Sequence, residues 1–216
     1  MLVLGVGWGI GTLVKGSSFE HGVDCPLASW FEHRGHGLDA VSGYVSDLAN
    51  PFSTVIGTVV LALVLVLCTV CLARRPTRRR ILALVFEPPL QLVLAHGIGR
   101  ARPFAETQPC GHLIHEVGTE MQFTSFPSGH SAAAVVLFGV AAILVQQKWC
   151  GGPWARRSVA AAACLLAALV AASRVYRRVH FLSDVIGGVA LGGAWLLITV
   201  YAFRLAVPSE AVGAGR

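Results

Sequence analysis

Apolar residues occur in long runs along this chain, and short polar segments separate the runs. A helix that crosses a membrane needs about 20 mostly apolar residues. The pattern predicts five such helices, at Pro51–Ala73, Ile81–Ile98, Ser131–Val145, Ser158–Ala172 and Val185–Phe203. A further apolar run, Leu2–Val14, is shorter, and we interpret it as a short or N-terminally incomplete first span.

The runs together predict an all-α fold, an integral-membrane bundle of about six transmembrane helices with its active site at the outer membrane face. The composition agrees, because 55% of the residues are hydrophobic and only 13% are charged, whereas a soluble domain carries about 25% charged residues. We expect a single domain over residues 1–216, with a motif-bearing core at about 51–203. Residues 15–50 would form an outer loop or interfacial helix, and residues 205–216 a cytoplasmic tail.

Two local patterns qualify this picture. Gly188 and Gly192 form a small-xxx-small pattern, which lets a neighbouring helix approach closely. Trp30, Phe31 and Leu38 stand among charges in the segment 15–50. That segment fits two interpretations, an amphipathic helix in the membrane interface or an ordered loop packed on the bundle.

Arginine-rich loops give the bundle an orientation. Ala73–Arg80 and Gln146–Arg157 lie in alternate loops, and loops rich in arginine and lysine stay in the cytoplasm. We therefore interpret the net charge of +6 as a consequence of membrane topology, and no nucleic-acid partner is expected. We expect a multi-pass protein of the cell membrane, whose opposite face is periplasmic or extracellular. That outer face receives Lys15–Asn50, Gly99–His130 and Ser173–Asp184.

Three polar clusters fall at helix ends on this outer face: Gly99–Phe104, Phe126–Ser131 and Ser173–Asp184. In the third, His180 and Asp184 are four residues apart, so on a helix they share a face and can hydrogen-bond. A carboxylate on one imidazole nitrogen leaves the other nitrogen able to attack. Arg174 adds a planar fork that suits phosphate oxygens.

The second cluster opens a helix. Ser128 and Gly129 can offer a hydroxyl and backbone N–H groups to an anion, and His130 places a second imidazole beside it. Arg102, from the first cluster, adds another cation. Each cluster alone has an ordinary explanation. The His–Asp spacing is common in surface or core pairs, Ser-Gly-His usually caps a helix, and Arg-Pro usually forms a turn. Their joint occurrence on one face predicts a metal-free oxyanion site.

The order of these motifs resembles the type 2 phosphatidic acid phosphatases, which share their site with the vanadium haloperoxidases. That family has Lys-x6-Arg-Pro, then Pro-Ser-Gly-His, then Ser-Arg-x5-His-x3-Asp. This chain matches at Arg102-Pro103, Pro127-Ser128-Gly129-His130 and Ser173-Arg174…His180…Asp184. It departs at Ala95, where the family has its lysine, and His96 or Arg100 would have to replace that cation.

The resemblance implies metal-independent hydrolysis of a lipid phosphate or diphosphate, such as polyprenyl diphosphate or phosphatidate. According to this resemblance, His180 attacks phosphorus, Asp184 orients His180, and His130 protonates the leaving group. Arg102, Ser128, Gly129 and Arg174 would hold the phosphate. The partners expected are the lipid substrate and membrane lipids, and no cofactor is expected.

Other interpretations stay open. Ala95 favours a catalytically weakened family member, retained for lipid or partner binding, whereas intact His130, His180 and Asp184 argue against it. A non-enzymatic transport protein would carry ionisable residues at mid-membrane, where only Glu87 is a candidate. A vanadate-dependent oxidase would share the site, but the family's oxidases are typically soluble. Cys110, His112 and His115 have loose spacing for a zinc site, so we expect no metal. Cys25 and Cys110 both fall in outer loops, and a disulfide between them remains open.

Overall fold

The computed structural model describes residues 2–33, 37–47, 91, 93–103, 110, 124–148 and 151–205. Every regular element in these ranges is a helix, which confirms the all-α prediction. Residues 93–98 are also helical. The other helices are α1 (Leu2–Val14), the π-helix η1 (Glu20–Asp24), α2 (Cys25–Glu32), α3 (Asp39–Asp47), α6 (Gly129–Lys148), α7 (Pro153–Tyr176) and α8 (Leu182–Leu205).

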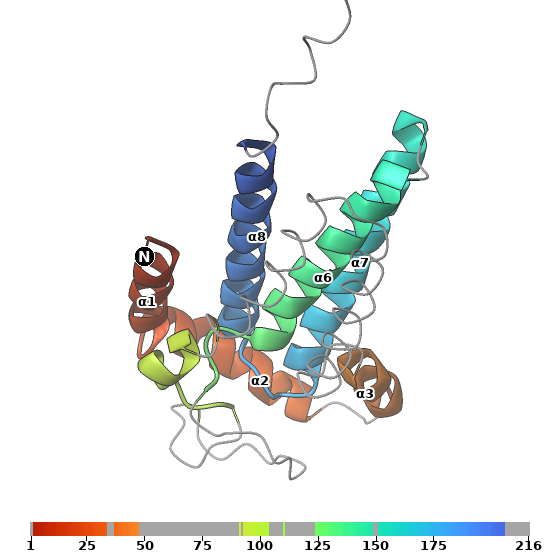
Figure 1. Ribbon diagram of the computed structural model, residues 1–216. Coiled ribbons are helices and arrows are strands. Elements are labelled where there is room, and N and C mark those ends of the chain that lie inside the picture. The colour runs from red at the N-terminus through yellow and green to blue at the C-terminus, as the bar shows by residue number, and fades with distance from the viewer. Residues whose placement is uncertain are drawn as a thin grey trace, which may run out of the picture.

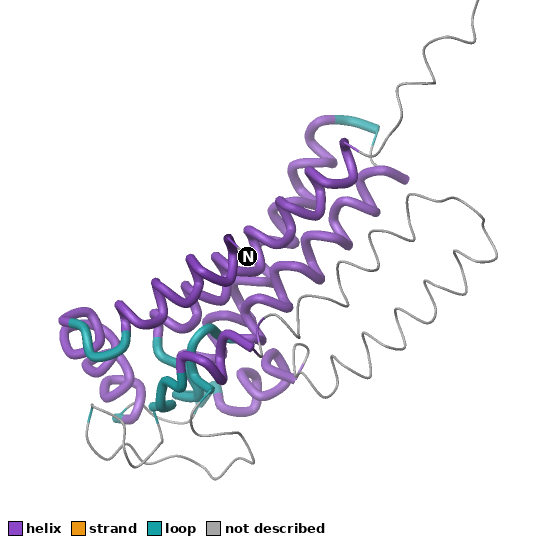
Figure 2. Tube along the Cα trace, turned by 60° about the vertical axis from the view of Figure 1, so that its left-hand side comes forward, coloured by secondary structure: helices purple, strands orange, loops and turns teal. Residues whose placement is uncertain are grey.

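Three long helices form the body of the described structure. α6 packs against both α7 and α8, and the three run side by side in Figures 1 and 2. They contain the predicted spans Ser131–Val145, Ser158–Ala172 and Val185–Phe203. Pro51–Ala73 and residues 81–90 lie outside the described residues, so the number of about six helices stays a prediction.

Glycines on α8 explain how closely it approaches α6. A Cβ atom at Gly188 would lie 2.3 Å from the carbonyl oxygen of Ser128, and one at Gly192 would lie 2.5 Å from that of Ala132. Real Cβ atoms do not come this close to backbone oxygen, so any larger residue would push the helices apart. The close packing expected from the small-xxx-small pattern is confirmed. It seats the start of α8 against the turn that begins α6.

The outward faces of the long helices are apolar. Leu165 and Leu169 on α7, and Leu197 on α8, are all exposed. Exposure of such side chains to water is unfavourable, whereas contact with lipid chains is not. Among the described residues, Gly129–Gln146 and Pro153–Tyr176 are long and apolar enough to cross a membrane, and Gly5–Val14 and Leu182–Ile198 form shorter apolar helices. These faces indicate a membrane location.

The segment after α1 folds into short helices that cover one end of the bundle. In Figure 1, α2 and α3 lie at the lower end, where α6 and α8 begin and α7 ends. Phe31 packs beside Val175 and Val185, and Val45 packs beside Val170. The described part of the segment thus packs on the bundle, and it does so as short helices and not as a loop. Contact with the membrane interface stays a prediction for its exposed side chains, Trp30, Leu38, Val41 and Tyr44.

α1 packs against the helical residues 93–98. A Cβ at Gly97 would lie 2.0 Å from the Trp8 ring, and a Cβ at Gly11 would lie 2.4 Å from Ile98, so a larger residue at either position would displace these side chains. Lys15, just beyond α1, donates to the carbonyl oxygens of Ile98 at 3.3 Å and Gly99 at 3.2 Å. A cation at these carbonyls stabilises the end of a helix. This end leads directly into Arg100 and Arg102.

Candidate active site

The three polar clusters meet at the covered end of the bundle. The side chains predicted to do chemistry are largely inaccessible to water, since Ser128 and Asp184 are fully buried and the imidazoles and arginines are 3–8% exposed. Arg174, His180 and Arg102 all lie close enough to His130 to influence it electrostatically. Residues far apart in the sequence therefore gather around one point. The buried set is Arg102, Ser128, His130, Arg174, His180 and Asp184, and Gly129 is half-buried.

The turn before α6 is held from two sides. The Ser128 amide donates to the carbonyl oxygen of Asp184 at 2.9 Å, which ties the start of α6 to the start of α8. From the other side, the Gln91 amide donates to the carbonyl oxygen of Pro127 at 2.9 Å. A Cβ at Gly129 would lie 2.9 Å from the same Gln91 side chain, so glycine lets Gln91 reach the turn. The first amides of α6 are thereby fixed in direction.

His180 is oriented by a residue that the sequence did not single out. Its Nδ1 lies 2.8 Å from the carbonyl oxygen of Ser125. A carbonyl oxygen only accepts hydrogen bonds, so Nδ1 carries the proton and the lone pair lies on Nε2. That tautomer is the one a nucleophilic imidazole requires.

The direct hydrogen bond expected between His180 and Asp184 is absent. The two residues do share a face, but Asp184 Oδ2 lies 3.8 Å from His180 Nδ1, which is an ion-pair distance. The carboxylate instead accepts from the Ser125 hydroxyl at 2.5 Å and from the Phe181 amide at 2.8 Å. These contacts hold Asp184, and Ser125 connects it to His180 because its hydroxyl and its carbonyl contact the two side chains. No motif in the sequence marks Ser125 for this role.

The loop between α7 and α8 carries His180 to its place. The carbonyl oxygen of Arg174 accepts from the amides of Val179 at 3.2 Å and His180 at 3.4 Å, which folds the chain back at the end of α7. Arg178 takes a left-handed conformation, φ 57°, within this turn. Arg102 reaches across to donate to the carbonyl oxygen of Val179 at 3.3 Å. Arg102, Arg174 and His180 are thus linked through one turn.

Arg100 does not replace the lysine missing at position 95. Its five N–H groups donate to Glu20, Asp24, Ser183 and Asp184, so none is left for a phosphate. Burial opposes its charge, but the neighbouring carboxylates outweigh burial and raise the pKa of Arg100 above its ordinary value. The hypothesis that Arg100 takes over phosphate binding is wrong for this reason. His96, the other candidate, is exposed, and Ala95 is fully buried.

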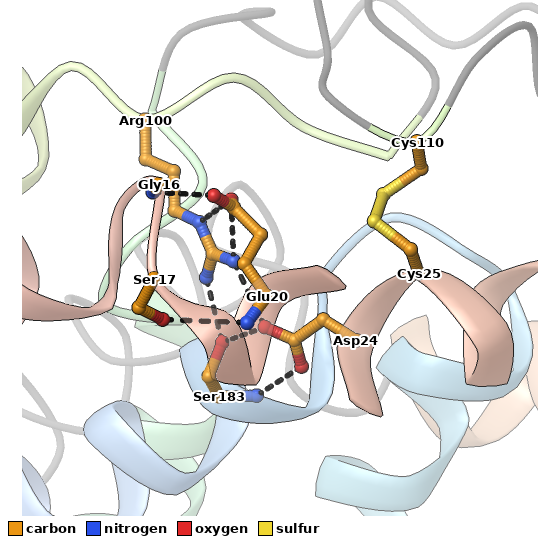
Figure 3. The surroundings of a disulfide bond; sticks show 8 residues. All are labelled: Gly16, Ser17, Glu20, Asp24, Cys25, Arg100, Cys110 and Ser183. Carbon is orange, nitrogen blue, oxygen red and sulfur yellow. Dashed lines mark hydrogen bonds and ion pairs between the residues drawn. A yellow bond between two sulfur atoms is a disulfide. The ribbon is translucent and has the colours of Figure 1, made fainter. Parts of the chain in front are cut away.

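The cysteines settle one question that the sequence left open. Cys25 and Cys110 form a disulfide, with their Cα atoms 5.2 Å apart (Figure 3). The bond joins the start of α2 to Cys110, seven residues after Pro103 in the sequence. His112 and His115 lie outside the described residues. Within the ranges that the structure covers, no group of three possible metal ligands occurs.

Comparisons with known proteins agree with this geometry. Residues 77–207 match the sequence profile of the PAP2 superfamily. The chain is 34% identical over 127 residues to a lipid A 1-phosphatase of Rhizobium etli, covering 55% of this chain and 47% of that protein. It is 38% identical over 104 residues to phosphatidylglycerophosphatase B of Bacillus subtilis, covering 48% and 46%. It therefore spans about half the length of the curated relatives it matches.

Solved structures show the same fold. A transmembrane PAP2-type phosphatidylglycerolphosphate phosphatase from Bacillus subtilis matches with a TM-score of 0.76 at 22% identity, covering 96% of this chain and 97% of that one. Aquifex aeolicus LpxE matches with a TM-score of 0.57 at 21% identity, covering 82% and 94%. The resemblance first drawn from three short motifs is thus confirmed by the family profile and by the fold. This chain belongs to the PAP2 superfamily.

Proposed function

We propose that this protein hydrolyses a lipid phosphate or diphosphate without a metal, through a phosphohistidine on His180. The observation that carries the proposal is the tautomer of His180. The Ser125 carbonyl holds the proton on Nδ1, which leaves the Nε2 lone pair to attack phosphorus. The buried cations Arg102 and Arg174 and the imidazole of His130 share this end of the bundle.

The first step is attack of His180 Nε2 on the phosphorus atom. A nitrogen–phosphorus bond forms as the bond to the leaving oxygen breaks, and His130 protonates that oxygen. The imidazole of His180 gains positive charge in this step. Asp184 Oδ2, 3.8 Å from Nδ1, stabilises that charge without taking the proton.

The second step returns the enzyme to its starting state. A water molecule attacks the phosphohistidine, and His130, now neutral, accepts a proton from that water. The nitrogen–phosphorus bond breaks, and inorganic phosphate leaves with the oxygen from water. For a diphosphate substrate, the first step releases the lipid monophosphate instead of an alcohol.

Phosphate oxygens would be held by the groups that face this point. Arg102 and Arg174 supply cationic forks, and the first amides of α6 supply N–H groups beside Gly129. The Ser128 hydroxyl accepts from the Ser131 hydroxyl at 3.1 Å, so its own proton is available for an oxygen of the substrate. These groups stabilise transition-state charge in the way that Mg²⁺ does in other phosphoryl transfer enzymes.

A lipid is the substrate class that the surroundings favour. A cavity of about 510 Å³ lies between α1 and α8, lined by apolar side chains such as Ile10, Leu94 and Ala190. Its lining also includes Pro127 and Ser183, the chain neighbours of Ser128 and Asp184. A hydrocarbon chain in this cavity would leave its phosphate near the site. Both curated relatives are named as phosphatases of lipid phosphates.

The site would face the outside of the cell. α6 has 20 residues and is about 30 Å long, so in a membrane Gly129 and Lys148 would stand on opposite sides of the apolar core. Arg156 and Arg157, in the first turns of α7, lie at the Lys148 end. Positive charge marks the cytoplasmic side. This supports a multi-pass protein with His130 and His180 at the outer face.

The test is phosphate release by the purified protein in detergent. The panel holds polyprenyl diphosphate, phosphatidate and phosphatidylglycerol phosphate, each assayed with EDTA and beside His180→Ala. Release that resists EDTA and disappears in His180→Ala supports the proposal and identifies the substrate. Release that persists in His180→Ala contradicts it.

A weakened enzyme is the second candidate, because Ala95 is buried and Arg100 has no donor left for phosphate. Folded protein that releases no phosphate from any member of the panel would favour it.

A further inference from the structure

Two carboxylates of the segment before α2 are buried although no motif of the site includes them. Glu20 is 2% exposed and Asp24 is 1% exposed, on the π-helix η1. Acidic side chains are almost never fully buried unless they are paired. Their partner, Arg100, is about 80 residues away in the sequence, and it is itself 1% exposed.

Arg100 connects these two carboxylates to Asp184. Its Nε and Nη2 donate to Glu20 Oε1 at 2.9 and 2.8 Å, and Nη2 also donates to Asp24 Oδ2 at 2.9 Å. Its Nη1 donates to Asp184 Oδ1 at 2.5 Å. The guanidinium also lies 4.6 Å from the centre of the Phe181 ring, next to His180 in the chain. One side chain thus joins the outer segment to the carboxylate beside the nucleophile.

Asp24 makes a second connection, to the start of α8. Its Oδ1 accepts from the Ser183 amide at 3.0 Å, and its Oδ2 accepts from the Ser183 hydroxyl. The amides in the first turn of a helix have no partner within the helix, so Asp24 caps α8 from another part of the chain. The cap lies one residue before Asp184. Arg100 therefore fixes the side chain of Asp184, and the cap fixes the backbone next to it.

The two acids are themselves held in place (Figure 3). Glu20 Oε2 accepts from the Gly16 amide at 2.5 Å, and the Glu20 amide donates to the Ser17 hydroxyl at 3.3 Å. Cys25 follows Asp24 directly, and its disulfide to Cys110 anchors the other end of η1. Figure 3 shows Glu20, Asp24 and Ser183 gathered around the Arg100 guanidinium, with the disulfide beside them.

We propose that Glu20 and Asp24 are positioning residues of the active site, which act on Asp184 through Arg100 and Ser183. The Cys25–Cys110 disulfide holds them in register. This inference rests on the proposed function, because Asp184 matters only if His180 is the nucleophile. Neither acid touches the phosphate. They keep Arg100 turned toward Asp184 and away from the substrate.

A stabilising role alone does not account for this network. Buried ion pairs are often no more stable than apolar residues of similar volume, because removing charges from water costs several kcal/mol per ion. Here three carboxyl groups surround one guanidinium, and one of the three is Asp184. The connections end beside the nucleophile, so their effect falls on the chemical step.

The experiment compares Glu20→Gln and Asp24→Asn with Asp39→Asn, an acid on α3 that takes none of the five donors of Arg100. Each variant is assayed for kcat and KM on the lipid phosphate that wild type hydrolyses. A displacement of catalytic groups by about 1 Å can lower the rate about 100-fold. We expect kcat to fall about 10- to 100-fold in the two variants, with KM within twofold of wild type. Asp39→Asn should match wild type.

A double-mutant cycle with Arg100→Gln separates positioning from general damage. Once Arg100→Gln is present, adding Glu20→Gln should change kcat less than twofold, because the path through Arg100 is already broken. Arg100→Lys keeps the charge but not the planar fork, so it should not restore kcat. Ser183→Ala, which leaves every charge in place, is the variant to use if Glu20→Gln does not fold. It should lower kcat with KM unchanged.

The contribution of the disulfide is tested with a matched pair of cysteine variants. Cys25→Ser removes the bridge, whereas Cys164→Ser removes an unbridged thiol on α7. Cys25→Ser should lower kcat at constant KM, and Cys164→Ser should not.

The inference is overturned if wild type is active while Glu20→Gln and Asp24→Asn keep its kcat. Additive losses in the Arg100→Gln background, or a rise in KM alone, would also overturn it. An inactive wild type would instead count against the proposed function.

Discussion

Arg100 and Arg102 are two residues apart and both buried, yet they belong to regions of opposite character. On one side, Arg100 is surrounded by carboxylates and uses all its donors within the protein. On the other side, Arg102 gathers with Arg174 and the imidazole of His130. The partners of an arginine, and not its type or its place in the chain, therefore separate an arginine that holds the protein from one that we propose holds the substrate.

Asp184 stands between the two regions. Its Oδ1 takes the Arg100 ion pair, and its Oδ2 lies nearest to His180. In our proposal, the acidic region therefore positions the nucleophile without approaching the phosphate. The predictions below separate the two regions, and they run from the largest expected effect to the smallest.

Arg102→Gln should have the largest effect. It removes a cation that stabilises the negative charge on the phosphoryl oxygens in the transition state. Loss of one such donor lowers kcat about 100- to 1000-fold. We expect kcat to fall in this range and KM to rise as well, while the melting temperature stays near that of wild type. Steady-state kinetics and thermal unfolding in the same detergent provide the measurements. Unchanged KM together with a large loss of melting temperature would place Arg102 in the structural region instead.

Arg100→Gln should give the opposite pattern. It leaves buried carboxylates without their cation, and breaking a buried pair in this way costs about 3–5 kcal/mol of stability. We expect a clear drop in melting temperature, a kcat that falls about 10- to 100-fold, and a nearly constant KM. A rise in KM as large as that of Arg102→Gln would show that Arg100 holds the substrate after all.

Ser125→Ala should have an intermediate effect. It removes the hydroxyl that donates to Asp184 but keeps the carbonyl that orients His180. We expect kcat to fall roughly tenfold, which corresponds to about 1.4 kcal/mol. Ser42→Ala, at a buried serine on α3, is the control and should stay within twofold of wild type. A loss as large as that of His180→Ala would mean that the hydroxyl takes part in the chemistry.

Ala190→Phe should have the smallest effect, and only on lipids with long chains. Ala190 lines the apolar cavity between α1 and α8, whereas Val189 is also exposed but lies outside that lining. Each buried methylene of the substrate contributes about 0.8 kcal/mol, so a filled cavity should lower kcat/KM several-fold. Val189→Phe should leave it unchanged, as should a short-chain substrate with either variant. Equal losses for both variants would show that the cavity does not receive the chain.

The sequence was sufficient to predict which motif residues gather at one end of the bundle. Ser128, His130, Arg174 and His180 belong to short motifs, in which local spacing determines which side chains share a helix end. The glycine pattern on α8 likewise predicted a close contact with a neighbouring helix, because such a contact depends on the missing Cβ atoms at Gly188 and Gly192; the structure shows that this helix is α6.

The acidic side could not be predicted in the same way. Glu20 and Asp24 meet Arg100 only because η1 folds across the end of the bundle, and nothing in their spacing indicates a partner so far along the chain. Ser125 escaped notice for a related reason, since it acts partly through its backbone carbonyl, which every residue has. The missing His180–Asp184 hydrogen bond follows from these unseen partners, which occupy the carboxylate.

The most direct test of the central claim is a search for the covalent intermediate. Protein mixed with labelled substrate would be quenched within milliseconds and analysed by mass spectrometry for a phosphorylated peptide. The account predicts a phosphate on His180 that is lost in acid and stable in base, and that is absent from His180→Ala. Turnover of the same substrate without any phosphate on His180 would contradict the account.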